Sequence, residues 1–221
     1  LARELPIPDR RAEDWKYTQV AKLFTANYGA PVAPASVSLP PRLPFPATRV
    51  VFVNGHFRAD LSDDLKAQEG VVIDSLGKQA SNSLIKAHYG SLASVGDRLF
   101  TAMNAAAPTN GLLLLVFKTV KLAQPIHVLH ITTAEAQLIQ PRDLFLVQEG
   151  ATAEVIIEHV STSLDMTTSL DRTDSLINGV RECFIAEGAK LTVHKLQNAT
   201  AGPAHIEAEH VVVRTKGADR K

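Results

Sequence analysis

From residue 111 onward the sequence repeats one pattern, in which a short corner separates two apolar runs. The corners read "KTVKL", "EGATAEV", "EGAKLTV" and "KGADRK", and each follows a strand-like segment. Four equivalent corner positions can be assigned, with successive spacings of 31, 38 and 29 residues: Thr119, Gly150, Gly188 and Gly217. An irregular period of about 30 residues with strands in every unit is typical of a solenoid, because no single unit can bury its apolar face alone.

This pattern predicts a mainly β fold, a right-handed parallel β-helix whose first coils occupy residues 111–221. Stacked coils would pair strand to strand and bury aliphatic side chains in layers. Glycine permits the positive φ of a tight corner, and the small alanine that follows fits inside it. The alternative is a sandwich of antiparallel strands, in which the Glu-Gly and Lys-Gly pairs are hairpin turns.

Residues 1–110 are predicted to form a separate helical and mixed α/β region. Asp9 can cap a helix over residues 10–28 that ends at Gly29. Apolar residues at roughly helical spacing could bury one face of that helix: Trp15, Val20, Leu23 and Phe24.

Three further segments complete this first region. Prolines concentrated near residues 31–46 predict a linker or an extended surface arm, since proline removes a backbone donor and blocks helix formation. Asn54-Gly55 lies between two apolar runs and predicts a hairpin. Residues 75–107 are predicted to be mixed and mostly helical, closed by Pro108 and Gly111.

Composition excludes several classes of protein. Lysine plus arginine equal aspartate plus glutamate at 23 each, so the charge balance does not indicate a nucleic-acid-binding surface. The longest apolar run, "GLLLLVFK", is the length of a strand, so we expect no membrane partner. The chain has one cysteine, Cys183, and cannot be stapled by internal disulfides, which predicts a reducing compartment, the cytoplasm.

Four sequence blocks stand in a fixed order: "RRAEDWKYTQVAKLF", "VVFVNGHFRADLSD", "VKLAQPIHVLHIT" and "VQEGATAEVIIEHVS". Together they resemble the SufD family of the SUF iron–sulfur cluster assembly complex. The first block carries the family signature, for which we assign a structural or interface role: Glu13, Trp15, Lys16, Tyr17 and Thr18. We expect Trp15 and Tyr17 to anchor the first helix to its own fold.

The resemblance implies an amino-terminal helical region, a parallel β-helix and a carboxy-terminal helical domain. It also implies a complex with the paralogue SufB and the ATPase SufC, in which the SufD subunit is a non-catalytic scaffold that acts with SufB in cluster assembly and iron acquisition. We expect this chain to be a fragment or the ordered part of a longer protein, because it stops early in the β-helix. No catalytic or cluster-ligand residue of the family can therefore be assigned in this chain. The open strand edge at Val211–Val213 predicts self-association.

The remaining candidate residues favour structural roles. Cys183 lies within a predicted strand and is interpreted as a small buried hydrophobe, although it could supply one ligand to a site shared with another chain. Histidines of the repeat region form no metal-binding sequence motif, and we interpret them as solvated or hydrogen-bonded strand residues: His127, His130, His159, His194, His205 and His210. Histidines from different coils could still meet in space.

Two other function classes stay open at this point. A β-helix carbohydrate-active enzyme would place carboxylates along one face of the coils, whereas the acids of this repeat lie at turns and alternating positions: Glu149, Glu154, Glu158 and Glu187. A plain protein-interaction module is the second alternative, because a fold alone does not decide function.

The single thiol leads to a test. Iron–sulfur clusters normally need four ligands, usually cysteines, so this chain alone should not hold a stable cluster or any other cofactor. Anaerobic reconstitution of the 221-residue chain, followed by desalting and by iron and sulfide analysis, should leave no stoichiometric cluster. A cluster that survives desalting on a monomer would refute this expectation.

Overall fold

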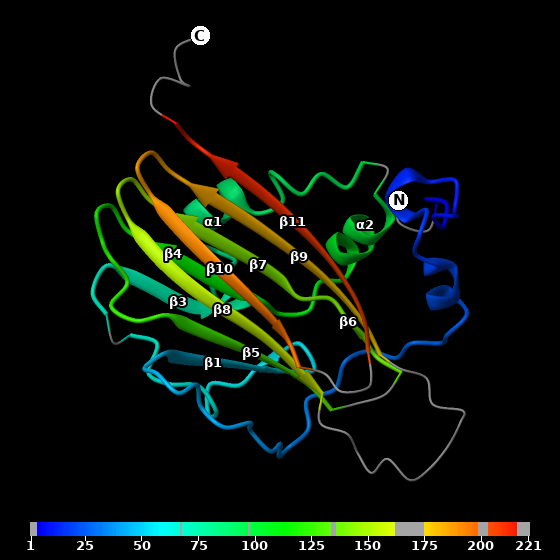
Figure 1. Cartoon of the computed structure of the whole chain (residues 1–221), viewed down its shortest axis with the longest axis horizontal. Helices are drawn as coiled ribbons and strands as arrows, with labels where there is room; N and C mark the ends of the chain where they lie inside the picture. The colour runs from blue at the N-terminus through cyan, green and yellow to red at the C-terminus, as the bar shows by residue number, and fades with distance from the viewer. Residues whose placement is uncertain are drawn as a thin grey trace.

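The computed structural model describes residues 4–66, 68–96, 98–133, 136–161, 175–198 and 203–215, and it is mainly β (Figure 1). Five short helices accompany the strands in this described part: η1 (Glu13–Trp15), η2 (Val20–Phe24), η3 (Leu76–Gln79), α1 (Ser83–His88) and α2 (Leu99–Ala106). The first six strands are β1 (Thr48–Val53), β2 (His56–Phe57), β3 (Val71–Ser75), β4 (Leu112–Val116), β5 (Ile126–Thr132) and β6 (Leu138–Ile139). The others are β7 (Arg142–Val147), β8 (Thr152–Ser161), β9 (Leu176–Ile185), β10 (Lys190–Gln197) and β11 (Ala204–Val213). None of the described helices has the length and apolar character needed to cross a membrane.

The strands form two sheets, between which the chain alternates. The first sheet has the order β10-β8-β5-β1-β2 and the second β11-β9-β7-β4-β3, with β6 pairing β9. Each ladder between successive repeats is parallel, from β4–β7 to β9–β11 in one sheet and from β5–β8 to β8–β10 in the other. Only β1–β2 and β3–β4 are antiparallel, so both sheets are mixed. The predicted parallel pairing is confirmed, and the antiparallel sandwich is wrong for the described repeats.

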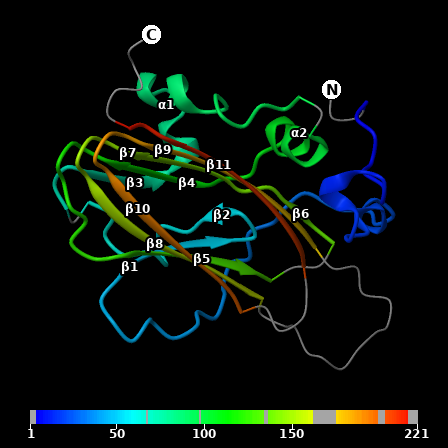
Figure 2. The same cartoon turned by 45° about the horizontal axis from the view of Figure 1, so that its top comes forward.

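The two sheets face each other and enclose an apolar core (Figure 2). Val50 and Val128 of the first sheet pack in one cluster with Leu114 and Phe145 of the second. We call the sheet surfaces that carry this cluster the inner faces. Helices α1 and α2 lie on the outer side of the second sheet, where Ile85 of α1 packs against the outer side chains of β4 and β7 (Figure 2).

The repeat corners stack on one another. Thr119, Gly150 and Gly188 have φ values of 62°, 68° and 67°. The Thr119 N–H donates to the Glu149 carbonyl oxygen at 2.8 Å, and the Gly150 N–H donates to the Glu187 carbonyl oxygen at 3.0 Å. The predicted equivalence of these three corners is therefore confirmed, while Gly217 lies outside the described residues.

The predicted helix over residues 10–28 is wrong. Two short 3₁₀ helices, η1 and η2, stand in its place, although Asp9 does accept from the Arg11 N–H at 2.8 Å. The rings of Trp15 and Phe24 both contact Phe100 of α2, with centroids 5.0 Å and 5.8 Å away. Nine residues along an α-helix rotate a side chain by about 180°, so a continuous helix would direct these two rings to opposite sides. Contact of both rings with Phe100 therefore requires a break between η1 and η2.

The proline-rich segment 31–46 is an extended arm, as predicted, without helix or strand. Its carbonyl oxygens accept from side chains of the first sheet and its hairpin. Arg49 donates to Pro40 and Pro41 at 3.2 Å and 2.7 Å, and Arg58 donates to Pro34 at 2.9 Å. The arm therefore accepts hydrogen bonds from Arg49 of β1 and from Arg58, which follows β2.

The Asn54-Gly55 hairpin is confirmed. Both residues have positive φ, 47° and 76°, and β1 pairs β2 with Phe52 opposite Phe57. Residues 75–107 contain η3, α1 and α2, as predicted. Strands β1, β2 and β3 of the first 110 residues join the two sheets, and the division of the chain near residue 110 stays a prediction.

Among the described glycines, Gly111 leaves the least room for a Cβ atom, which gives a test. A Cβ atom at this position would lie 1.8 Å from the Arg142 carbonyl oxygen. Gly111→Ala should therefore force β4 and β7 apart and lower the free energy of unfolding by about 3 kcal/mol in chemical denaturation. Gly29→Ala is the control, because its Cβ would meet nothing nearer than the Ala136 carbonyl oxygen at 3.8 Å. Equal stability of the two variants would contradict the packing argument.

Candidate functional site

The inner faces change from apolar to charged along the second sheet. Asp143, Arg181 and Glu209 lie side by side on β7, β9 and β11, in register. Arg181 Nη2 donates to Asp143 Oδ2 at 3.0 Å, and Arg181 Nη1 pairs with the Glu209 carboxylate. The Arg181 side chain is 2% exposed. A charge this deeply buried must be matched by opposite charges, and the neighbouring strands supply them.

Lys195 of β10 connects the two sheets through this cluster. Its Nζ lies 3.0 Å from Glu207 Oε2 and 2.9 Å from Glu209 Oε1, both on β11. Glu207 Oε1 also lies 2.8 Å from Arg181 Nη2. The interior charge cluster thus comprises two cations and three carboxylates: Asp143, Arg181, Lys195, Glu207 and Glu209.

The electrostatics of the cluster keep two of its members, Arg181 and Glu207, charged. Burial acts to lower the pKa of Arg181, but the carboxylates of Asp143, Glu207 and Glu209 outweigh it and raise that pKa. Burial acts in the opposite sense on Glu207, whose pKa the cations Arg181 and Lys195 hold below its usual value. All three carboxylates are engaged in ion pairs.

Beside the charges runs a column of stacked rings. Phe52, His130 and His159 occupy matching positions on β1, β5 and β8, with ring centroids 5.1 Å and 4.7 Å apart. His205 of β11 approaches His159 from the opposite sheet at 4.3 Å. We call the three imidazoles the histidine column.

The histidine column is uncharged at neutral pH. Burial lowers the pKa of His130 to about 4, and burial also lowers the pKa of His159 and of His205. His159 Nδ1 is buried and has no hydrogen-bond partner among the described residues. Neutral imidazoles are potential metal ligands. Nevertheless, no three histidine, cysteine, aspartate or glutamate side chains within the described ranges are placed to hold a metal ion.

The signature residues lie on the surface at η1. Trp15 packs on Phe100, as expected, but Tyr17 is 91% exposed and does not anchor this segment. The Lys16 ammonium lies 5.5 Å from the centroid of its ring. Thr18 closes the turn with its N–H on the Trp15 carbonyl oxygen at 3.0 Å, and Glu13 is exposed. The assigned structural or interface role of the five residues stays a prediction.

Cys183 is a buried core residue, as interpreted from the sequence. It is 3% exposed in the apolar core, and burial raises the pKa of its thiol to about 12. A thiol in this environment stays protonated and is a poor nucleophile and a poor metal ligand.

The other strand histidines behave as predicted in two cases. His127 Nε2 bonds Glu158 at 2.8 Å, and His194 Nε2 bonds Glu154 at 2.9 Å. His159 pairs in register with Gln197 rather than with His194, so those two histidines do not meet.

The sequence interpretation missed the interior charge cluster, although a signal for it exists. Asp143 and Arg181 each stand seven residues before a corner glycine, Gly150 and Gly188. Opposite charges at one repeat position predict contact once the ladders are known to be parallel. The sequence allowed that histidines from different coils meet, and His130, His159 and His205 do so; which histidines meet is set by strand register and not by spacing from the corners.

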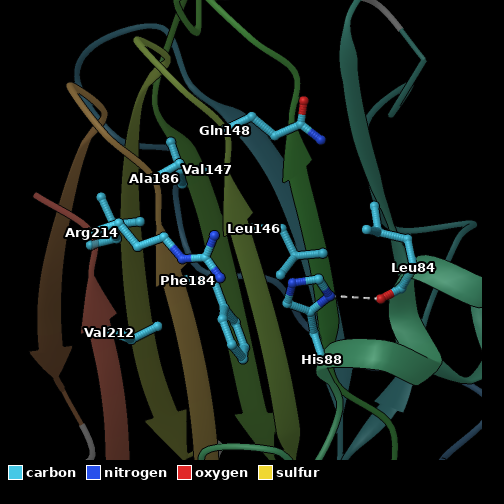
Figure 3. Close-up of a pocket in the computed structure, with 10 residues that line it drawn as sticks. Leu84, His88, Leu146, Val147, Gln148, Phe184, Ala186, Val212 and Arg214 are labelled. Atoms are coloured by element: carbon cyan, nitrogen blue, oxygen red, sulfur yellow. Dashed lines mark hydrogen bonds between the residues drawn. The ribbon is translucent and has the colours of Figure 1, made fainter. Parts of the chain in front are cut away.

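A small groove on the outer face of the second sheet is less suited to a ligand (Figure 3). Its volume is about 120 Å³, and apolar side chains of β7, β9 and β11 form its floor. His88 Nδ1 donates to the Leu84 carbonyl oxygen at 2.8 Å, and its ring packs edge-on against Phe184 at 4.6 Å. Small-molecule sites usually occupy about 300–1,000 Å³, so this groove is too small for most of them.

Comparison with known proteins gives two family matches that together extend along nearly the whole chain. Residues 2–128 match the family described as SufBD protein N-terminal region. Residues 130–219 match the SUF system FeS cluster assembly, SufBD core domain. A similar curated protein is the iron–sulfur cluster assembly SufBD family protein of Synechocystis sp., which is 26% identical over 216 residues. That match covers 93% of this chain and 47% of the relative, so the chain spans about half the length of the relative.

The histidine column predicts a pH dependence. The folded-state pKa of His130 is depressed, so its neutral form stabilises the fold above the ordinary pKa of 6.5, and this stability is lost as pH falls toward 4. The free energy of unfolding should fall by about 2 kcal/mol more in the wild-type protein than in His130→Phe between about pH 7.5 and about pH 5.

Chemical denaturation across this pH range checks the expectation. Phe52→Leu is the control, because it weakens the ring stack without removing the imidazole. This variant should be less stable throughout and keep the pH dependence of the wild-type protein. Parallel stability curves for the wild-type protein and His130→Phe would contradict the assignment.

Proposed function

The chain belongs to the SufBD family of the SUF iron–sulfur cluster assembly system, and from this premise we propose that it acts in iron–sulfur cluster biogenesis. The observation that carries this proposal is the pair of consecutive family matches, over residues 2–128 and 130–219. The similarity to a named iron–sulfur cluster assembly SufBD family protein supports it.

Within that family, we propose a SufD-type subunit that assembles with SufB and SufC. The resemblance of the signature segment, Glu13 to Thr18, supports the SufD assignment. We also propose that the alternating strands are coils of a right-handed parallel β-helix. Parallel ladders between successive repeats and the stacked corners at Thr119, Gly150 and Gly188 support that fold.

The proposed role is that of a non-catalytic scaffold in the cytoplasm, without a cofactor bound to this chain alone. The carboxylates of the interior charge cluster are engaged in ion pairs, which supports a structural function for them. The protonated thiol of Cys183 supports a cluster whose ligands come from other chains. In this proposal the chain contributes shape and partner contacts, and its partners contribute ATP hydrolysis and cluster ligands.

Co-purification tests the assembly. The full-length protein, tagged and co-expressed with SufB and SufC of the same source, should elute with both in one size-exclusion peak. A tagged protein that recovers neither partner would argue against the complex.

Activity of an iron–sulfur enzyme in cells tests the role in biogenesis. Deletion of the gene should lower aconitase activity while the amount of aconitase protein stays constant, and the restored full-length gene should reverse the loss. Unchanged aconitase activity in the deletion strain would contradict a function in cluster assembly.

A further inference from the structure

A larger cavity lies away from the interior charge cluster, on the outer side of the second sheet. It measures about 480 Å³ and lies between η3, α1, the segment after α2 and the start of β7. Its size falls in the range of about 300–1,000 Å³ that is typical of small-molecule sites. Leu76, Ile85 and Pro108 give it apolar walls.

A buried guanidinium also lines this cavity. The Arg142 side chain is 2% exposed, and its Nη2 donates to Glu182 Oε2 at 3.0 Å. Its Nη1 lies 3.3 Å from Asn104 Oδ1, and its guanidinium carbon lies 4.7 Å from the Tyr89 ring centroid. These contacts fix the orientation of the guanidinium. Nε is buried and has no partner within the described part of the chain.

The Glu182 carboxylate is already saturated by other donors. Besides Arg142, it accepts from the backbone N–H groups of Gly90, Leu92 and Ala93 at 2.8, 2.9 and 3.0 Å. Glu182 therefore holds Arg142 and the loop after α1 in place and is not among the residues that line the cavity. Arg142 therefore lines the cavity as a cation of fixed orientation.

The charged residues on the cavity wall are all cations. Lys86 on α1 is exposed and lines the cavity together with Arg142, and no carboxylate is among the described lining residues. Tyr89 contributes a phenol whose pKa burial raises, so it stays a neutral hydrogen-bonding group. Apolar walls with two cations and a neutral hydroxyl favour a ligand that is apolar at one end and anionic at the other.

We propose that this cavity binds a small organic carboxylate with an apolar body. The carboxylate pairs with the Lys86 ammonium beside the fixed Arg142 cation, while the hydrocarbon part lies against Leu76, Ile85 and Pro108. The site is independent of the proposed function in cluster assembly, because its residues are separate from the interior charge cluster and from the signature segment.

Calorimetric titration of the full-length protein with 4-phenylbutyrate tests the site, with 4-phenylbutyramide as the neutral match. The carboxylate should bind at least about fivefold more tightly than the amide. Lys86→Gln should weaken binding of the carboxylate by about fivefold and leave binding of the amide unchanged. Lys78→Gln is the matched control. Lys78 is on η3, but its ammonium lies over the Phe57 ring and does not line the cavity. This control should bind as the wild-type protein does.

A blocking variant avoids disturbing the buried pair of Arg142 and Glu182. Ala80 is exposed and lines the cavity, so Ala80→Trp should fill it and abolish binding of both compounds while thermal unfolding stays as in the wild-type protein. Three outcomes would overturn the proposal: no binding of the carboxylate, equal affinity for carboxylate and amide, or undiminished binding in a folded Ala80→Trp variant. Equal weakening by Lys86→Gln and Lys78→Gln would show general attraction to surface charge and would also overturn it.

Discussion

Parallel pairing in register between successive turns of the chain is the constraint on which the rest of this structure depends. Each inward side chain of one strand lies beside the equivalent side chain of the next, so the interior consists of columns. Val50, Val128 and Ile157 illustrate an apolar column, since they pair in register on β1, β5 and β8 and belong to one cluster. A side chain is therefore tolerated in the interior only if side chains of the same column, or of the facing sheet, pack against its apolar surface or pair with its polar groups.

Charges obey this rule in the second sheet. Asp143, Arg181 and Glu209 alternate in sign across three strands, and Lys195 from the facing sheet balances the last of them. Removal of one member would leave a buried charge without its partner, which commonly costs about 3–5 kcal/mol. One part of the space between the sheets is therefore polar. There, ion pairs connect the two sheets in place of apolar contacts.

The sequence predicts those features that depend on local chemistry. Corner glycines, the Asn54-Gly55 hairpin and the proline-rich arm all follow from backbone preferences that act within a few residues. The first helix was predicted wrongly because Trp15 and Phe24 meet the same distant ring, a tertiary contact that overrides helical spacing. The interior charge cluster and the histidine column depend on register between strands about 30 residues apart, which local patterns do not encode.

The two ends of the strand stack differ in kind. At the early end, β2 and β3 run antiparallel to their neighbours, and the proline-rich arm occupies the donors of Arg49 and Arg58. At the other end of the second sheet, β11 pairs only with β9, and Val211 and Val213 are 56% and 57% exposed. The antiparallel strands β2 and β3 interrupt the parallel ladders at the early end. The strand stack therefore has a direction: it begins with antiparallel strands beside the proline-rich arm, and in the second sheet a further strand in parallel register would pair with the exposed strand β11.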